Sequence, residues 1–277
     1  MRWLELAWGS LRHLFLAVWA AIVIGPLVWV VVTSFKTDRE ILTDPWSLPQ
    51  DWHADNYSRA WDVANIGGYF VNSITVVIPS VLLTLALSAA ISYVIARFDF
   101  RGRQLLNAFA LSGLLFPVFL ALVPLFFLAN DLGLTNSHLG LSVIYAAYSI
   151  SFTTLFLTNF FRTIPQELHE AATLDGAGEF RIFLTIMLPL AAPGLVTMGI
   201  FNFIGQWNQF ILPYVLINDE RLFVLPQGMQ YLMIQQQYDS DWSALFAAVT
   251  IVMVPTIVIY TVFQQRIQAA LTSGALK

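Results

Sequence analysis

Six long apolar segments, each free of Asp, Glu, Lys and Arg, constrain the fold of this chain more than any other feature of its sequence. A helix needs about 20 apolar residues to cross the hydrocarbon core of a membrane. Only 11% of the 277 residues are charged, against roughly 25% in soluble domains. The sequence therefore predicts an all-α polytopic membrane protein with six transmembrane helices, at residues 14–35, 70–96, 105–129, 139–161, 194–217 and 242–263. Prolines in these segments predict kinks or breaks at Pro26, Pro79, Pro117, Pro124, Pro213 and Pro255.

The distribution of Lys and Arg predicts the direction of these segments. Nine of the 13 cationic residues fall at the N-terminus, in the second and fourth loops and in the C-terminal tail, and four fall in the other loops. Because cytoplasmic loops carry the excess of Lys and Arg, we expect both termini to face the cytoplasm. The first outer loop, at about residues 36–69, is acidic, and its Trp46, Trp52 and Trp61 suit an interfacial belt or a partner surface.

The absence of certain residues and motifs argues against several classes of function. Ion-coupled transporters usually hold ionisable groups within the membrane, so proton coupling is disfavoured, although sodium coupling through backbone carbonyls stays open. A P-loop needs a glycine-rich turn that ends in Lys followed by Ser or Thr, and neither Lys36 nor Lys277 has that context. There is no cysteine, and the four histidines lack metal-ligand spacing. We therefore expect no catalytic site, no metal site and, at a net charge of −4, no nucleic-acid partner.

The longest inner loop, at residues 162–193, is too patterned to be a linker. Pro165 and Glu167 suit the start of a helix, and Gly176 suits a left-handed cap at its end. A second short helix follows before Pro189 and Pro193, so the loop is predicted to be a helix, a tight turn and another helix. The first helix would carry a small apolar face, made by Leu168, Ala171, Ala172 and Leu174, and His169 is expected at its surface. From composition alone, an interfacial amphipathic hairpin without a partner fits equally well.

The same loop carries a specific resemblance. It contains Glu170-Ala171-Ala172, Asp175-Gly176-Ala177 and, about nine residues after the glycine, an I-x-L-P sequence that ends at Pro189. This pattern resembles the EAA loop of the permeases of binding-protein-dependent ABC importers. The resemblance extends over nearly the whole chain, and the stretches at residues 26–42, 96–102, 206–208 and 265–277 are similar to the carbohydrate-uptake branch, in particular to its maltose-type second permease. One departure is Ala270, where the family usually has Gly.

The resemblance implies a function and a set of partners. Residues 1–277 would form one transmembrane domain of an ATP-driven sugar importer in the bacterial plasma (inner) membrane, and the family branch favours an oligosaccharide as the sugar. A second homologous permease would complete the path, two ATPase subunits would bind ATP and Mg below it, and an extracytoplasmic sugar-binding protein would dock outside. The residues implied to couple the chain to an ATPase subunit are Glu170, Ala171, Ala172, Asp175, Gly176 and Ala177.

Polar residues in the fifth apolar segment are candidates for the substrate path. They are Asn202, Gln206, Trp207, Asn208 and Gln209. At helical spacing Asn202, Gln206 and Gln209 share one face, and amides and aromatic faces suit a neutral sugar. Hydrogen bonding between helices is the first explanation of the same amides, and contact with a sugar is the second. By position alone, the loop at residues 218–241 corresponds to the loop that reaches into the binding protein in maltose-type importers.

Two other functions remain open at this stage. One is an ABC permease for a non-sugar solute, such as a phosphate ester or a polyamine. The other is a secondary transporter or channel that acts alone. Charged solutes would favour opposite charges along the path, and the apolar segments contain none. The identity of the sugar is not decided by the sequence.

Overall fold

A computed structural model describes residues 2–115, 117–235 and 241–275, and every regular element within these ranges is a helix. Residues 236–240, in the predicted loop 218–241, lie outside the described part of the chain. The chain divides into two compact units, which are described separately: Met1–Gly68 with Gly228–Pro255, and Tyr69–Gln227 with Thr256–Lys277.

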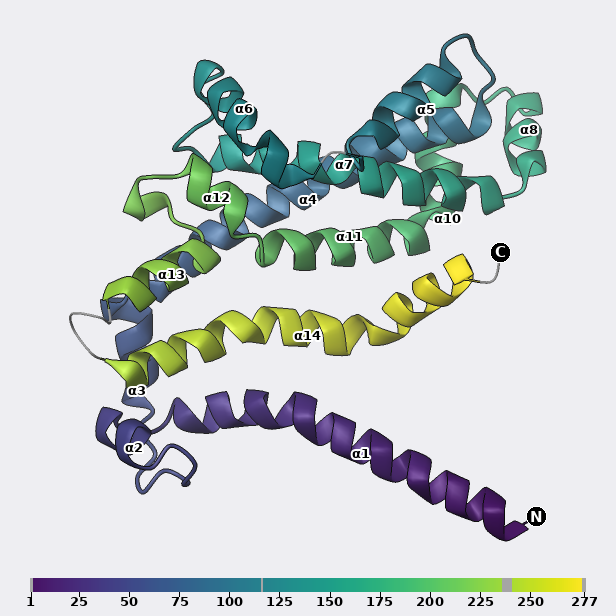
Figure 1. The fold of residues 1–277 in the computed structure, drawn as a ribbon. Coiled ribbons are helices and arrows are strands. Elements are labelled where there is room, and N and C mark those ends of the chain that lie inside the picture. Colours follow the sequence, from purple (N-terminus) through teal and green to yellow (C-terminus); the bar gives the residue numbers. More distant parts are fainter. Residues whose placement is uncertain (1, 116, 236–240, 276–277) are drawn as a thin grey trace. The chain divides into compact units, whose positions relative to one another are not determined.

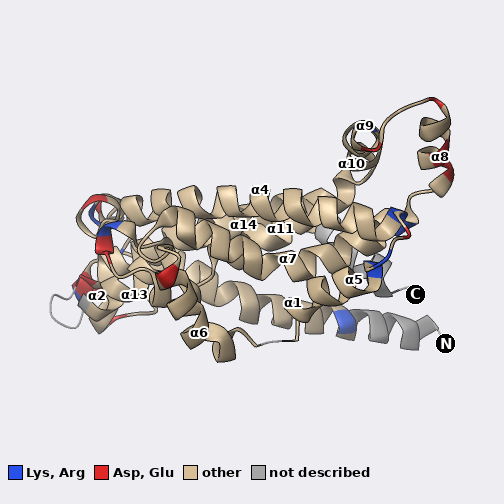
Figure 2. Cartoon of the chain, turned by 90° about the horizontal axis from the view of Figure 1, so that it is seen from above, with Lys and Arg blue, Asp and Glu red and all other residues tan. Residues whose placement is uncertain are grey.

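Four helices are long and apolar enough to cross a membrane, and a bent helix pair raises this number to five within the described residues. Charged residues gather at the ends of the long helices and in the loops (Figure 2). The chain is therefore an all-α polytopic membrane protein. The four long helices are α1 (Arg2–Thr33), α4 (Ile66–Arg97), α7 (His138–Thr163) and α14 (Trp242–Ala275).

The other two predicted segments are each divided between two helices. Residues 105–129 correspond to α5 (Arg103–Ser112) and α6 (Val118–Asp131), and Pro117 stands immediately before α6. Proline has no backbone N–H to donate, so it is tolerated at a helix start. Residues 194–217 correspond to α11 (Ala192–Trp207) and α12 (Ile211–Leu216). At Pro26, Pro79, Pro124 and Pro255, by contrast, the helix continues through the proline.

In the first unit, α1 is followed by a folded loop. The most apolar 18 residues within Leu11–Thr33 of α1 have a mean hydropathy of 2.6, and none of these 18 residues is buried within the chain. Such a surface suits lipid or another apolar partner. After α1 come α2 (Asp38–Thr43), α3 (Asp55–Ser58) and a π-helical turn, Arg59–Val63.

A capping box begins α2. The Glu40 backbone N–H donates to the Thr37 hydroxyl, and the Glu40 carboxylate accepts from the Thr37 backbone N–H at 2.8 Å. The carboxylate also accepts from the Gln50 backbone N–H at 2.9 Å. These donors, the Thr37 N–H first, hold the pKa of Glu40 below its ordinary value. Glu40 in its charged form therefore ties α2 to the loop that follows it.

A buried lysine organises the same loop. The Lys36 ammonium donates to the carbonyls of Asp44 (3.0 Å) and Pro45 (3.2 Å), and its side chain is fully buried. The Asn56 amide donates to the carbonyls of Ser34 and Lys36. These hydrogen bonds satisfy backbone carbonyl groups in the loop after α1, where no long helix provides partners for them. Trp46 stays 80% exposed, so the interfacial belt and the partner surface both remain open for it.

In the second unit, α4 and α7 pack side by side and run in the same direction (Figure 1). The Ser142 hydroxyl donates to the carbonyl of Val76, and the Ser92 hydroxyl donates to the carbonyl of Thr154, both at 3.0 Å. Residue numbers therefore rise together along the two helices. Small hydroxyl residues let membrane helices approach closely, and they explain why these side chains are buried in an apolar segment.

The helix α11 runs antiparallel to α7. Near the start of α11, a Cβ added at Gly194 would meet Phe160, close to the end of α7. Further along α11, the Asn202 side chain is hydrogen-bonded to Thr153, near the middle of α7. Beyond α12, the carbonyl of Leu216 accepts from the Asn136 backbone N–H, just before α7 begins. The segment from α11 to α12 thus follows α7 along its whole length.

Two adjacent polar residues of α4 fix the chain that follows α12. The Asn72 amide donates to the carbonyls of Arg221 and Phe223, each at 2.9 Å. The Ser73 hydroxyl accepts a hydrogen bond from the backbone N–H of Leu225, the first residue of α13 (Leu225–Gln235). Asn72 therefore has a structural role.

Candidate functional site

The first candidate site is the hairpin between α7 and α11. It consists of α8 (Gln166–Leu174), α9 (Glu179–Ile182), a π-helical turn (Phe183–Met187) and α10 (Leu188–Leu190). We call these residues, 166–190, the hairpin. Its second arm leads into α11 through a bend of 72°. Figure 2 shows acidic residues on α8, at one end of the helices of its unit.

A left-handed glycine ends α8. Gly176 has φ +80°, as predicted from its place after the helix. The Ala177 N–H donates to the carbonyl of Ala172, and the Gly176 N–H donates to the carbonyl of Thr173, both at 3.0 Å. This pair of bonds is a Schellman motif, which satisfies the last carbonyls of a helix. The tight turn is thereby fixed through the backbone.

The inner side of α8 packs against its own unit. His169 and Ala172 are 9% and 7% exposed, and Ala172 belongs to a core cluster with Tyr93, Phe161 and Ile182. The prediction that His169 is a surface residue was wrong. The sequence offered no signal for this burial, because the aromatic residues that cover the ring come from α4 and the loop after it.

A polar contact joins the two arms of the hairpin. The Nε2 atom of His169 lies 2.9 Å from the Glu179 carboxylate, on α9. The Tyr93 hydroxyl donates to the same carboxylate oxygen at 3.3 Å. Three elements, α4, α8 and α9, therefore meet at Glu179, and the contact holds the arms at a fixed spacing.

Arg97, the last residue of α4, binds the start of the hairpin. Its guanidinium donates to the carbonyls of Phe161 and Ile164, each at 2.7 Å, and to the Gln166 side chain at 2.9 Å. A cation at the C-terminus of a helix is favoured by the helix dipole. The sequence predicted Arg97 to be one of the cytoplasmic charges and part of the family-like stretch 96–102, and this role was not identified from it.

The outer side of α8 is open. Glu167, Glu170 and Ala171 are exposed, and Leu174 is 89% exposed. The predicted small apolar face is therefore divided, because Ala172 lies on the inner side. Asp175 and Gly176 are exposed at the turn, and Ala177 is half-buried. A partner on this face would meet carboxylates, a small residue and one large apolar side chain.

The second candidate site is a cleft between α7 and α11. It has a volume of about 460 Å³, and Asn202, Gln206 and Gln209 contribute to its wall. The Asn202 amide donates to the Thr153 hydroxyl at 2.9 Å, and the Gln206 amide donates to the Ser149 hydroxyl at 3.0 Å. The interhelical bonds considered in the sequence analysis are thus formed, on the wall of the cleft. We call it the polar cleft.

The remaining two path candidates do not line the polar cleft. Trp207 is 2% exposed, stacks on Phe203 at a centroid distance of 5.4 Å and meets Phe70 edge-on. Asn208 is exposed, and its amide donates to the carbonyl of Ile204 at 2.8 Å. Trp207 packs in the core of its unit, and Asn208 closes the end of α11.

Aromatic residues of α7 that were not identified from the sequence complete the polar cleft. Tyr145, Tyr148 and Phe152 line it, opposite Gly205 of α11. Their spacing of three and four residues places them on one helix face, which was a detectable signal. A Cβ added to Gly205 would meet nothing within 4 Å. Among the described residues, no three metal-ligating side chains gather.

Comparison with known proteins gives a consistent result. The profile of the family described as "Binding-protein-dependent transport system inner membrane component" matches residues 69–273. The diacetylchitobiose uptake system permease protein NgcG of Streptomyces coelicolor is 47% identical over 269 residues, which cover 97% of this chain and 89% of that protein. The trehalose transport system permease protein SugB of Mycobacterium tuberculosis is 31% identical over 273 residues, which cover 97% and 99%.

A solved structure shares the fold. A chain in the crystal structure of a bacterial ABC transporter involved in the import of the acidic polysaccharide alginate superposes with a TM-score of 0.83. The match covers 94% of this chain and 96% of that chain, at 21% identity.

Proposed function

The chain belongs to the family of binding-protein-dependent transport system inner membrane components, the permeases of ABC importers, and on that premise we propose that it imports a neutral oligosaccharide. It is a transmembrane component without an ATPase domain. Relatives named for the uptake of diacetylchitobiose and trehalose support a sugar substrate. A disaccharide of the diacetylchitobiose type is the first to test, because that relative is 47% identical.

The chemistry of the polar cleft carries the proposal. No residue of its wall is charged, and the wall combines two tyrosines, two phenylalanines and side-chain amides. Sugars are neutral and rich in hydroxyl groups, so amides and aromatic faces suit them and fixed charges do not. A phosphate ester or a polyamine would favour opposite charge in the cleft, which argues against the alternative of a charged solute.

We propose that the chain crosses the membrane six times, with both termini in the cytoplasm. Because α4 and α7 run in the same direction, the chain between them has to return across the membrane. The pair α5 and α6 would make this crossing, and α11 with α12 would make the fifth, since they follow α7 along its length. The excess of Lys and Arg on the side of the hairpin supports the orientation.

We propose further that the hairpin receives the motion of a separate ATPase subunit. The exposed face with Glu170, Ala171 and Leu174 is available to such a partner. The Schellman turn and the contact between His169 and Glu179 make the hairpin stiff. The assembly would comprise a second permease, two ATPase subunits and an extracytoplasmic sugar-binding protein, as the family name and the resemblance suggest.

Uptake by cells that carry the assembled transporter tests the substrate class. Labelled diacetylchitobiose, trehalose and an acidic oligosaccharide would be supplied separately, and we expect accumulation of a neutral sugar only. Cells with the same genes but an ATPase variant that cannot hydrolyse ATP are the control. Accumulation of the acidic sugar in preference to both neutral ones would contradict the proposal.

Cysteine labelling tests the orientation, since the chain has no cysteine of its own. A matched pair is Glu170→Cys in the hairpin and Asp51→Cys in the loop after α1, both at exposed positions. An impermeant thiol reagent added to intact cells should label the Asp51 variant and should reach the Glu170 variant only after the cells are opened. The reverse pattern would refute the orientation.

A further inference from the structure

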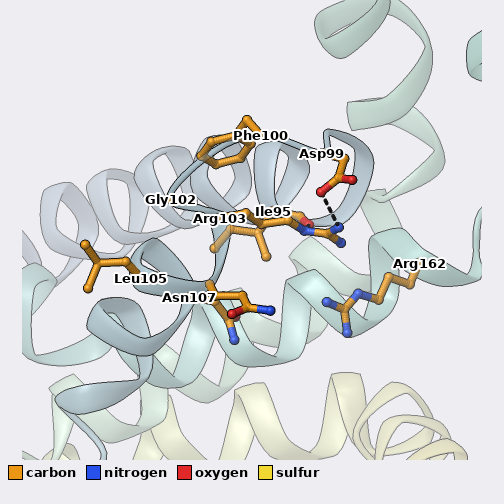
Figure 3. A pocket seen from close by; sticks show the side chains of 9 residues that line it. Ile95, Asp99, Phe100, Gly102, Arg103, Leu105, Asn107 and Arg162 are labelled. Atoms are coloured by element: carbon orange, nitrogen blue, oxygen red, sulfur yellow. Dashed lines mark hydrogen bonds and ion pairs between the residues drawn. The ribbon is translucent and has the colours of Figure 1, made fainter.

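A second pocket lies away from both candidate sites, where α4 ends and α5 begins (Figure 3). Its volume is about 570 Å³. Its wall combines the loop between these helices, the first turns of α5 and Arg162 near the end of α7. The hairpin and the polar cleft contribute no residue to it.

The pocket carries positive charge that is only partly compensated. The Arg103 side chain donates to the carbonyl of Ile95 at 3.0 Å and lies 3.7 Å from Asp99, whose side chain is 97% exposed. Arg162 is exposed and, among the described residues, makes no hydrogen bond or ion pair through its guanidinium. Figure 3 shows this guanidinium directed toward the Asn107 amide. Two guanidinium groups and an amide are donors suited to the oxygens of a phosphate.

Apolar side chains continue from the pocket along α5. Leu105 lines the pocket and is 74% exposed, and Phe109, one turn further, is 76% exposed. Residues four apart lie on the same side of a helix. A stripe of exposed apolar residues, Leu105 and Phe109, therefore begins at the cationic pocket and continues along α5. An anion without an acyl chain would contact only the cationic pocket and not the apolar residues beyond it.

We propose that this pocket binds the phosphate group of an anionic phospholipid, with an acyl chain along Leu105 and Phe109. Basic pockets between transmembrane helices on the cytoplasmic side are suited to lipid headgroups. Arg103 and Arg162 hold the phosphate from α5 and α7, so the lipid joins two helices that pack together. The assignment to the inner leaflet rests on the orientation given under the proposed function; the binding chemistry does not.

Native mass spectrometry of the full chain in detergent tests the site. Phosphatidylglycerol and phosphatidylcholine with the same acyl chains would be titrated separately, and we expect stronger retention of phosphatidylglycerol. Arg162→Gln should weaken that retention about fivefold, equivalent to about 1 kcal/mol for one cation at a membrane surface. Arg162 has no side-chain partner to lose, so this change should leave the fold intact. Phe109→Ser should also weaken retention.

The matched control is Arg181→Gln, on α9, where another exposed arginine lies outside the pocket. It should retain phosphatidylglycerol as the unmodified chain does. Equal retention of the two lipids, or equal losses in the Arg162 and Arg181 variants, would overturn the proposal. Displacement of the lipid by millimolar inorganic phosphate would identify a simple anion site instead. Because orientation plays no part in detergent, a negative result leaves the transport proposal untouched; the uptake assay tests transport separately, and the cysteine labelling tests the orientation.

Discussion

Substitutions at Gly176 test the contribution of the hairpin's backbone conformation separately from the contribution of its surface. Gly176 has φ +80°, and a Cβ added there would meet nothing within 4 Å. A side chain at this position therefore changes the conformational energy of the turn without a clash inside the chain. The informative series is Gly176→Asn, Gly176→Ala and Gly176→Val.

The expected magnitudes follow from the left-handed conformation. An ordinary residue there costs roughly 1–2 kcal/mol, Asn costs less because it tolerates this region, and Val costs most because it is β-branched. One or two kcal/mol changes a population by a factor of about 5–30. The Schellman bond from Ala177 to Ala172 should be open least often in the Asn variant, more often in the Ala variant and most often in the Val variant. Side-chain volume, by contrast, rises in the order Ala, Asn, Val.

Two measurements check this prediction. Hydrogen exchange at the Ala177 amide reports the opening of the turn in the isolated chain. Sugar-stimulated ATPase activity reports coupling in the assembled transporter, and it should fall in the same order. If Gly176→Ala couples better than Gly176→Asn, size governs the effect, and the argument from backbone strain fails. Wild-type exchange and coupling in the Val variant would remove the hairpin from the mechanism.

Three further predictions address the polar cleft and the loop after α1. Gly205→Ala should preserve uptake, while Gly205→Leu should reduce it with assembly intact, because only the larger side chain fills the cleft; unchanged uptake in the Leu variant would place the path elsewhere. Asn202→Leu and Thr153→Val should show a coupling energy of about 0.6 kcal/mol in a double-mutant cycle of unfolding in detergent, and strict additivity would contradict the bond. Since the pKa of Glu40 is lowered in the fold, its contribution to stability is present above its unfolded pKa of about 4.3 and is lost as the pH falls through the lower folded value. Glu40→Gln should therefore raise hydrogen exchange in residues 37–50 at pH 7 and make it less dependent on acid, and an unchanged acid response would refute the assignment.

Local chemistry made part of this structure predictable. Long charge-free segments predicted the all-α membrane class, and Gly176 predicted the end of α8 because only a residue without a Cβ adopts positive φ freely. The spacing of Asn202, Gln206 and Gln209 predicted a shared helix face; all three line one cleft, although α11 ends at Trp207, before Gln209. Each of these inferences depends on residues within a few turns of one another.

The parts that escaped prediction depend on distant residues. His169 is buried because Tyr93 and Phe98 cover it, and Ala172 faces inward for the same reason. The sequence of α8 does not distinguish its inner side, since the adjacent small residues Ala171 and Ala172 lie on the outer and the inner side respectively. Likewise, the amides of α11 have hydroxyl partners on α7, about 50 residues earlier, which an isolated sequence does not pair.

The bend at Ala191 bears on how a force on the hairpin would reach the polar cleft. A free hinge would absorb the motion, whereas a stiff bend would transmit it. The Ala191 N–H donates to the carbonyl of Met187 at 2.9 Å, and the carbonyl of Ala191 accepts from Leu195 at 3.0 Å, so helical hydrogen bonds continue on both sides. Ala191 itself is fully buried in the core cluster. We infer that α9, α10 and α11 would move as one bent body, so that a displacement of the hairpin would move Asn202 and Gly205 relative to α7. Such a movement would break the bonds from Asn202 and Gln206 to Thr153 and Ser149. On the proposed function, the same amides would then be free to bind sugar hydroxyls. Interhelical bonding and sugar contact would then be two states of one set of residues.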